Sequence, residues 1–200
     1  DLPGGSHYTD PVLLHNGKVE RFRGYCMDVY TDATMRFIEE NRSRSLFAYL
    51  ATNTPHTPLE IAESYASPYR AMGLNDDTAR VYGMIGNIDE NIGRLLEKLK
   101  ALGLEENTIV IFMTDNGAQQ RNRYSAGLRA GKGTVYDGGI RVPFFLRWPA
   151  RITGGRQVER IAAHIDVAPT LLEACAVPKP AGVRFDGLSL LPLLENKQSH

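Results

Sequence analysis

The chain has 200 residues, of which 42% are hydrophobic, and its 23 Lys and Arg side chains equal its 23 Asp and Glu side chains in number. This length accommodates one large domain with a sizeable buried core. Because the formal net charge is zero, composition gives no support for a nucleic-acid partner or an anionic membrane surface. No apolar run approaches the ~20 residues that cross a bilayer, so we expect no membrane partner.

The first residue is Asp1 rather than Met, and no charged-then-apolar leader follows it. We interpret this start as a cut inside a longer chain, so targeting signals do not indicate the compartment. The two cysteines, Cys26 and Cys175, lack CxxC spacing. We favour two buried free thiols over a disulfide, although one disulfide stays open as an alternative.

The first third of the chain predicts a hairpin, a helix and a strand. Asn16-Gly17 between two short β-like segments is a strong hairpin signal. Residues 28–44 place apolar side chains at helical intervals, and residues 46–51 (LFAYLA) read as a buried strand. The loop NTPHTP at 53–58 follows. Its prolines restrict the backbone on both sides of His56, as a catalytic imidazole requires, while a structural or exposed histidine is the alternative.

A long helix is predicted from Asp76 and Asp77, which would cap it, to Gly103, which would end it. Glu90 and Arg94 are spaced for an ion pair on its polar side. Its apolar positions follow the intervals of one helical face: Val81, Met84, Ile85, Ile88, Ile92, Leu95, Leu96, Leu99 and Leu102.

The apolar run 109–113 (IVIFM) predicts a strand buried on both faces, as parallel sheets covered by helices require. With the preceding strand and helix it would complete a right-handed βαβ unit, which would bring His56 and Asp115 to the same edge of the sheet. Asp115 and Asn116 follow the strand directly, and two adjacent side-chain oxygens suit a hard cation such as Ca²⁺ or Mg²⁺. A simple Asp-Asn-Gly turn is the alternative.

The segment 118–139 is polar and rich in glycine, and it contains Lys132 between two glycines. It fails the phosphate-binding P-loop pattern, because Ala126 and Gly133 occupy two of the required positions. Lys132 is therefore either an anion-binding lysine or a solvated loop lysine. Towards the C-terminus we expect strands at 142–149 and 158–163, a helix at 166–176 capped by Asp166, and a short apolar segment at 188–194.

Five motifs occur in a fixed order along the chain: NTPHTP at 53–58, IVIFMTDNG at 109–117, GKGTVYDGGIRVP at 131–143, DVAPTLL at 166–172 and DGLSLLPLL at 186–194. This series resembles the type I sulfatases of the alkaline-phosphatase-like superfamily. The resemblance implies an α/β fold with a mostly parallel buried sheet flanked by helices. It also implies that residues 1–200 are the C-terminal half of a sulfatase catalytic domain, with a hairpin-containing lead-in at 1–24 and an α/β core at 25–194.

By this resemblance Asp115 and Asn116 would bind Ca²⁺, while His56 and Lys132 would both contact the sulfate, and either of the two is the candidate that protonates the leaving oxygen. Sulfated small molecules or glycans would be the ligands, and a secreted, periplasmic or lysosomal location is implied. A cation, a lysine and an imidazolium suit the charge that develops when a sulfate ester is cleaved.

The family's nucleophile is a formylglycine made from Cys or Ser in a Cys/Ser-x-Pro/Ala-x-Arg motif, and neither cysteine here lies in that pattern. The family's N-terminal Asp-Asp pair of calcium ligands also has no counterpart. We therefore expect these 200 residues alone to show no turnover and at most weak calcium affinity, since Ca²⁺ takes 6 to 8 oxygen ligands.

Two other functions are alternatives to the sulfatase. One is a phosphodiesterase or phosphonate hydrolase of the same superfamily, which would hold two transition metals with histidine ligands, so Asn116 favours the sulfatase. The other is a non-catalytic fragment that binds a sulfated glycan through Arg129, Lys132 and Arg141.

Overall fold

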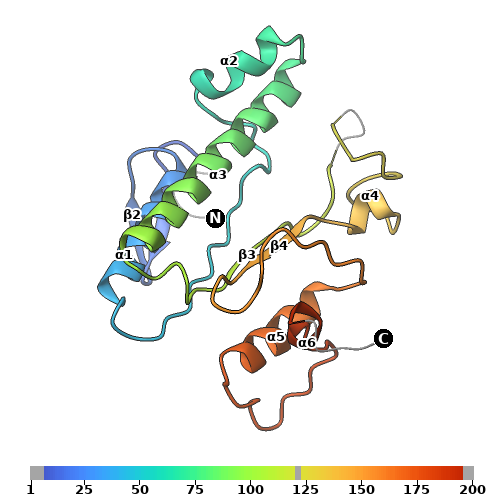
Figure 1. Cartoon of the computed structure of the whole chain (residues 1–200). Helices are drawn as coiled ribbons and strands as arrows, with labels where there is room; N and C mark the ends of the chain where they lie inside the picture. The colour runs from blue at the N-terminus through green and yellow to red at the C-terminus, as the bar shows by residue number, and fades with distance from the viewer. Residues whose placement is uncertain (1–6, 120–122, 196–200) are drawn as a thin grey trace. The chain divides into compact units, whose positions relative to one another are not determined.

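The computed structural model describes residues 7–119 and 123–195, with the element order β1, β2, α1, α2, α3, β3, α4 (Asp137–Ile140), β4, α5 and α6 (Figure 1). Two units are distinguished along the chain. Unit 1 comprises 1–105 and 117–140, and unit 2 comprises 106–116 and 141–200. The sequence-based division into a lead-in and a core stays a prediction.

The predicted hairpin opens unit 1. Strand β1 (Val12–His15) pairs with β2 (Lys18–Arg21) in an antiparallel ladder, in which His15 lies opposite Lys18. Asn16 and Gly17 connect the strands, and both have positive φ, at 49° and 82°. A type I′ turn requires this backbone conformation at both central residues, so the Asn-Gly prediction is confirmed.

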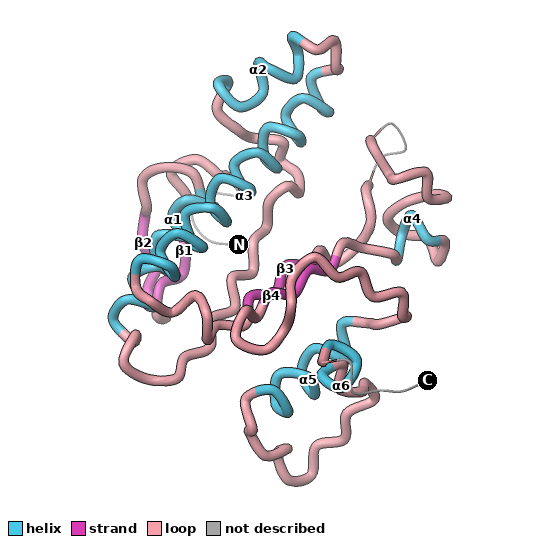
Figure 2. The backbone as a smooth tube through the Cα atoms, viewed as in Figure 1, coloured by secondary structure: helices cyan, strands magenta, loops and turns pink. Residues whose placement is uncertain are grey.

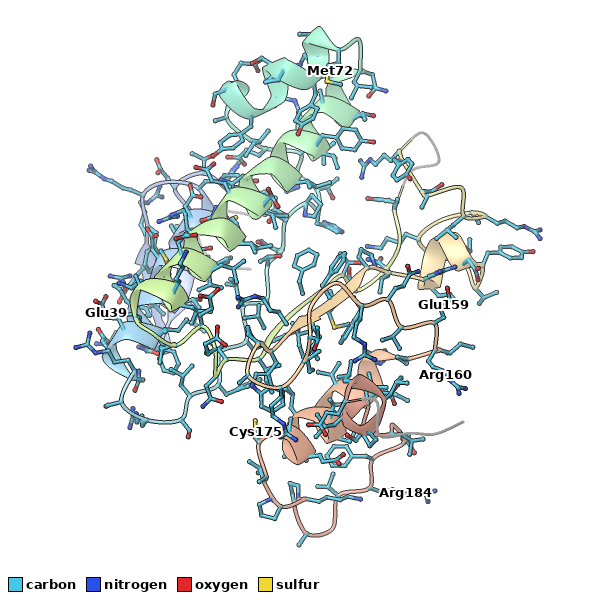
Figure 3. The ribbon with its side chains drawn as sticks, viewed as in Figure 1. Glu39, Met72, Glu159, Arg160, Cys175 and Arg184 are labelled. Carbon is cyan, nitrogen blue, oxygen red and sulfur yellow. The ribbon has the colours of Figure 1, made fainter. Side chains whose placement is uncertain are left out.

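Helix α3 (Asp76–Ala101) is the longest element of unit 1, and both α1 (Cys26–Glu40) and α2 (Glu63–Ala71) pack against it. Asn75, rather than the predicted Asp76 and Asp77, caps α3, because its side chain accepts a hydrogen bond from the Thr78 N–H at 2.9 Å. Glu39, labelled in Figure 3 at the end of α1, pairs with Lys98 of α3 at 2.7 Å.

The core of unit 1 joins the segment before the hairpin to the helices. Its buried cluster combines aromatic, sulfur-containing and aliphatic side chains from residues far apart in sequence: Tyr8, Tyr25, Cys26, Met27, Ile61, Ala66 and Met84. Leu50 and Leu59, on either side of the loop that contains His56, pack partly against this cluster. That loop therefore lies over a packed core.

The predicted strand at 46–51 is not observed in the part of the chain that the structure describes. These residues form an extended connection between α1 and α2, drawn as a long loop in Figure 2. Phe47 and Tyr49 are 72% and 83% exposed. The apolar pattern reports a tendency to be buried, but a strand also needs a neighbouring backbone, and no described segment pairs with this one. The predicted βαβ unit is therefore not formed within these residues.

Unit 2 contains the second predicted strand. Strand β3 (Val110–Met113) pairs with β4 (Phe144–Arg147) antiparallel, with Val110 opposite Arg147 and Met113 opposite Phe144. The α/β composition of the chain is as predicted, but the expected parallel pairing is absent from the described ladders. An uninterrupted apolar run indicates how a strand is covered and carries no information on the direction of its neighbour.

The C-terminal part of unit 2 consists of a short 3₁₀ turn (His164–Asp166), α5 (Val167–Ala174) and α6 (Leu191–Leu194). The Asp166 carboxylate does not cap α5. It accepts hydrogen bonds from the backbone N–H groups of Ala163 and Leu188, both at 2.8 Å, which lower the pKa of Asp166. No strand forms among residues 158–163, all of which are exposed.

Candidate functional site

His56 lies in an exposed loop between two cis peptide bonds, Thr54–Pro55 and Thr57–Pro58. Its Nδ1 atom lies 2.9 Å from the carbonyl oxygen of Thr57 and 3.2 Å from the Thr57 hydroxyl. A carbonyl oxygen can only accept a hydrogen bond, so Nδ1 carries a proton and donates a hydrogen bond to the Thr57 carbonyl. The neutral ring then leaves Nε2 unprotonated, and Nε2 is the atom that can take up and release a proton.

Two buried side chains of unit 1, those of Cys26 and Tyr8, form hydrogen bonds with this loop. The buried thiol of Cys26 donates to the Asn53 side-chain oxygen at 3.7 Å, and the Tyr8 hydroxyl contacts backbone carbonyls of the loop. Burial raises the pKa of Cys26 to about 11, so this thiol stays protonated near neutral pH. Cys26 and Cys175 are both free, as predicted, but only Cys26 is buried, and the predicted burial of Cys175 is wrong because that residue is exposed.

Tyr8 is a residue that the sequence analysis missed. It precedes the loop by 45 to 49 residues, and it stands in a polar segment with no periodic pattern. The one available signal was its aromatic ring, which a polar lead-in has little reason to contain unless the ring packs elsewhere.

Asp115 and Asn116 follow β3 directly, as predicted. The Asn116 side-chain amide donates to Asp115 Oδ1 at 2.5 Å, and the Thr114 hydroxyl donates to the Asn116 carbonyl at 3.3 Å. This arrangement leaves Asp115 Oδ2 and Asn116 Oδ1 outside the bond between the two side chains. Both are oxygens of the kind that hard cations take, so the donor chemistry fits Ca²⁺ or Mg²⁺.

These two residues supply only part of a metal site. In residues 7–119 and 123–195 no group of three or more His, Cys, Asp or Glu side chains is placed to hold a metal ion. The two oxygens fall short of the 6 to 8 that Ca²⁺ takes. Asp115 and Asn116 could therefore supply some, but not all, of the ligands of such a site.

The turn that presents Lys132 is closed by backbone contacts. The Lys132 N–H donates to the Ala118 carbonyl at 2.9 Å, and the Thr134 hydroxyl donates to the Gly131 carbonyl at 2.7 Å. A Cβ atom on Gly131 would lie 2.5 Å from the Ala118 oxygen, so only glycine allows this approach. The Lys132 side chain is exposed, with a tightly fixed backbone beneath it.

A shallow depression of about 410 Å³ adjoins this turn and is lined by Ser125, Leu128, Arg129, Ala130 and Tyr136. The Arg129 guanidinium lies 3.8 Å from the centre of the Tyr136 ring, and its Nη2 atom donates to the Tyr136 hydroxyl at 3.0 Å. The Arg129 guanidinium thus lies over an aromatic ring, with further donors available for an anion.

The structure groups the predicted site residues in two sets. His56 and Lys132 belong to unit 1, whereas Asp115 and Asn116 belong to unit 2, next to the point where the chain re-enters unit 1 at residue 117. The Gly117 N–H donates to the Gly139 carbonyl at 3.0 Å, and this bond links the end of the Asp-Asn-Gly motif to the glycine-rich segment. The convergence of all four side chains stays a prediction.

Comparison with known proteins decides the family. The family model described as Sulfatase matches residues 4–177. The chain belongs to the sulfatase family. This sulfatase chain is 30% identical over 201 residues to the uncharacterized sulfatase YdeN of Escherichia coli (strain K12), covering 98% of the chain, and 33% identical over 182 residues to human arylsulfatase A, covering 89%.

Its fold also matches a solved structure. The crystal structure of Ps i-CgsB in complex with k-i-k-neocarrahexaose superposes with a TM-score of 0.87 at 28% identity and covers 94% of this sulfatase chain. The alkaline-phosphatase-like α/β fold is therefore confirmed. The sulfatase chain spans 35% of YdeN, 33% of arylsulfatase A and 42% of the Ps i-CgsB chain, about a third of the length of the two relatives.

Proposed function

We propose that this chain carries part of a sulfatase active site, in which His56 and Lys132 engage a sulfate ester while Asp115 and Asn116 contribute ligands to a calcium ion. The observation that carries the proposal is the geometry of His56 within the matched family region, with Nδ1 on the Thr57 carbonyl and Nε2 left for a substrate. Composition alone supports no such assignment.

His56 can act as the general acid in one protonation cycle. Nδ1 keeps its proton and donates a hydrogen bond to the Thr57 carbonyl. A second proton, on Nε2, therefore makes the ring an imidazolium. As the bond between sulfur and the leaving oxygen breaks, Nε2 gives this proton to that oxygen and the ring returns to the neutral Nδ1–H form. Such proton transfer accelerates reactions ~10²- to 10⁴-fold.

Lys132 supplies a fixed positive charge. Its backbone is held by Ala118, and glycines on both sides let an anion approach without a side chain in the way. An ammonium group at this turn would bind a non-bridging sulfate oxygen and offset the negative charge that remains there. A calcium ion held in part by Asp115 and Asn116 would supply further positive charge to offset that of the sulfate.

The substrate is proposed to be a sulfated small molecule or glycan. The relatives include an arylsulfatase, and the similar Ps i-CgsB was solved with k-i-k-neocarrahexaose. The described residues contain no helix with the length and apolar character of a membrane span. A secreted, periplasmic or lysosomal location remains what the family implies.

The match of the Sulfatase family to 4–177 favours this function over a phosphodiesterase or phosphonate hydrolase. For the non-catalytic alternative, the one supporting observation is the Arg129 guanidinium stacked on Tyr136, beside the Lys132 turn. Binding of a sulfated oligosaccharide without turnover, even in the full-length protein, would support that alternative.

The test is substitution of His56 in the full-length sulfatase that contains these residues, assayed on an aryl sulfate ester. We expect His56→Ala to lower kcat by ~10²-fold or more, because the leaving oxygen loses its acid. His15→Ala is the matched control, since His15 lies on the hairpin and its Nδ1 pairs with Glu20 at 3.0 Å. Equal kcat values for His56→Ala and His15→Ala would refute the proposed role.

A further inference from the structure

The hydroxyl of Tyr8 lies beneath the His56 loop. Three carbonyl oxygens of the loop surround it, those of Asn53 at 3.0 Å, His56 at 3.2 Å and Thr57 at 3.3 Å. Tyr8 is only 4% exposed, so water does not compete freely for these contacts. One side chain from the start of the chain therefore reaches the backbone on both sides of the imidazole.

The chemistry of these contacts fixes the direction of donation. Carbonyl oxygens only accept, so the Tyr8 hydroxyl must be the donor. Burial, together with the nearby Cys26, Tyr30 and Glu60, raises the pKa of Tyr8 to about 12. The hydroxyl thus keeps its proton near neutral pH. Its single hydrogen is shared among three acceptors, so the three loop carbonyls all lie close to the Tyr8 hydroxyl.

The Thr57 carbonyl connects Tyr8 to the imidazole. The same oxygen accepts from the Tyr8 hydroxyl at 3.3 Å and from His56 Nδ1 at 2.9 Å. A carbonyl oxygen has two lone pairs, so it can serve both donors at once. The position of this oxygen determines how the ring is oriented and which of its nitrogens carries the proton in the neutral form.

Tyr8 is itself held by its ring and by its backbone. Its ring packs edge to face against Tyr25, with centroids 6.1 Å apart and planes at 85°. Its backbone N–H donates to the Glu60 carboxylate at 3.1 Å, and the neighbouring Thr9 N–H donates to the same group at 2.9 Å. These contacts hold the Tyr8 hydroxyl in one position relative to the loop.

We propose that Tyr8 is a positioning residue for His56, and that its hydroxyl sets the Thr57 carbonyl so that Nδ1 stays protonated and Nε2 faces the substrate. The inference rests on the proposed function of His56 for its effect on activity, but its structural part stands without it. Tyr8 is buried and would act through the loop carbonyls that its hydroxyl contacts.

The test uses Tyr8→Phe, which keeps the ring and removes only the hydroxyl. Tyr25→Phe is the matched control, because Tyr25 is also buried and its hydroxyl donates to a backbone carbonyl, that of Glu60 at 2.8 Å, outside the His56 loop. In the full-length sulfatase we expect Tyr8→Phe to lower kcat about tenfold with less than a twofold change in KM, a part of the ~10²- to 10⁴-fold effect of a positioned acid. Tyr25→Phe should leave both parameters near wild type.

A spectroscopic readout separates positioning from general stability. In the 200-residue chain, ¹⁵N shifts of the His56 imidazole should show one neutral tautomer, protonated on Nδ1. Tyr8→Phe should give a mixture of both tautomers, and Tyr25→Phe should preserve the single form. In the unsubstituted chain, the Tyr8 hydroxyl proton should exchange slowly with solvent and show contacts to the loop, which tests the geometry even if Tyr8→Phe does not fold.

The outcomes distinguish the two proposals. If His56→Ala keeps full activity while Tyr8→Phe still mixes the tautomers, the catalytic role of His56 fails and the positioning by Tyr8 holds. If His56→Ala abolishes activity while Tyr8→Phe matches Tyr25→Phe in kcat and in imidazole shifts, the positioning role is overturned. A rapidly exchanging Tyr8 hydroxyl in the unsubstituted chain would overturn it as well.

Discussion

Glu60 is the residue that attaches the start of the described chain to the rest of unit 1. Its carboxylate accepts the backbone N–H groups of Tyr8 and Thr9, and His7 Nδ1 lies 3.7 Å from it. Burial raises the pKa of Glu60, but the hydrogen bonds from Thr9 and Tyr8 outweigh burial, and the pKa ends below its ordinary value. The ionised form is therefore the one that the folded chain stabilises.

This shift predicts acid sensitivity. A carboxyl group with a lowered folded pKa contributes stability above its unfolded pKa of about 4.3, and that contribution is lost as the pH falls through the folded value. We expect the urea midpoint of the wild-type chain to fall between pH 5 and pH 3. Glu60→Gln should start from a lower midpoint at pH 7 and lose less over the same range, because it has no carboxylate to protonate.

Glu97→Gln serves as the control for this measurement, since Glu97 is an exposed carboxylate on α3. Its urea midpoint should follow the wild-type curve across the whole pH range. If Glu60→Gln and Glu97→Gln give the same curve, Glu60 does not anchor the Tyr8 segment through its charge.

The sequence suggested candidate site residues and missed Tyr8, which contacts one of their loops. His56 could be chosen because prolines bracket it, and Asp115 because an apolar predicted strand ends just before it; their roles stay predictions. Tyr8 could not be chosen, because its contacts span 45 or more residues and leave no local pattern. Similarly, Arg94 does not pair with Glu90 as predicted. It contacts Asp32 of α1 at 2.5 Å, while Glu90 accepts from the Tyr65 hydroxyl.

Between α1 and α3 the buried contact is polar. Asp28 Oδ1 accepts from the side-chain amides of Asn91 at 2.7 Å and Asn87 at 3.0 Å, and both asparagines are 1% exposed. Asn91 also donates to the Asn87 carbonyl and accepts from Arg94, whereas Asn87 Oδ1 has no partner in the described structure. Asn91 therefore carries most of this contact.

We predict that Asn91→Ala lowers the free energy of unfolding of unit 1 by about 2 kcal/mol, since it leaves Asp28 and Arg94 each short of a partner. Asn87→Ala is the paired comparison. It should lower that free energy by only about 1 kcal/mol, because it also removes an oxygen that was buried without a partner. Urea denaturation of both variants measures the difference. A larger loss for Asn87→Ala would contradict this assignment.

Elements with strong local signals could be predicted, and their packing faces only in part. The Asn-Gly hairpin and helices α1, α3 and α5 form where local pattern places them, with shifted ends. The apolar stripe of α3 did not identify the buried face fully, because Ile85 is 45% exposed and Asn87 is buried. The Asp28 carboxylate of α1 accepts a hydrogen bond from Asn87 and so makes the burial of Asn87 favourable. The periodicity of α3 does not reveal a partner on another helix.

The whole chain exposes apolar surface where strand pairing was expected. Phe47 and Tyr49 stand out from the extended segment after α1, and Phe145 of β4 is 66% exposed. Large exposed aromatic side chains form apolar surface of the kind that is usually covered by another element or a partner. The described residues therefore do not form the sheet that these segments predicted, and the chain spans about a third of the length of the two relatives.

We propose that His56, Lys132, Asp115 and Asn116 form one site in the full-length sulfatase. A crystal structure of that protein with calcium and a bound sulfate ester would test this proposal. We predict a sulfate oxygen within about 3 Å of His56 Nε2 and of Lys132 Nζ, and Asp115 and Asn116 oxygens within about 2.3–2.6 Å of the calcium ion. A structure with His56 and Asp115 on separate surfaces, and the ester bound by neither set, would contradict the account.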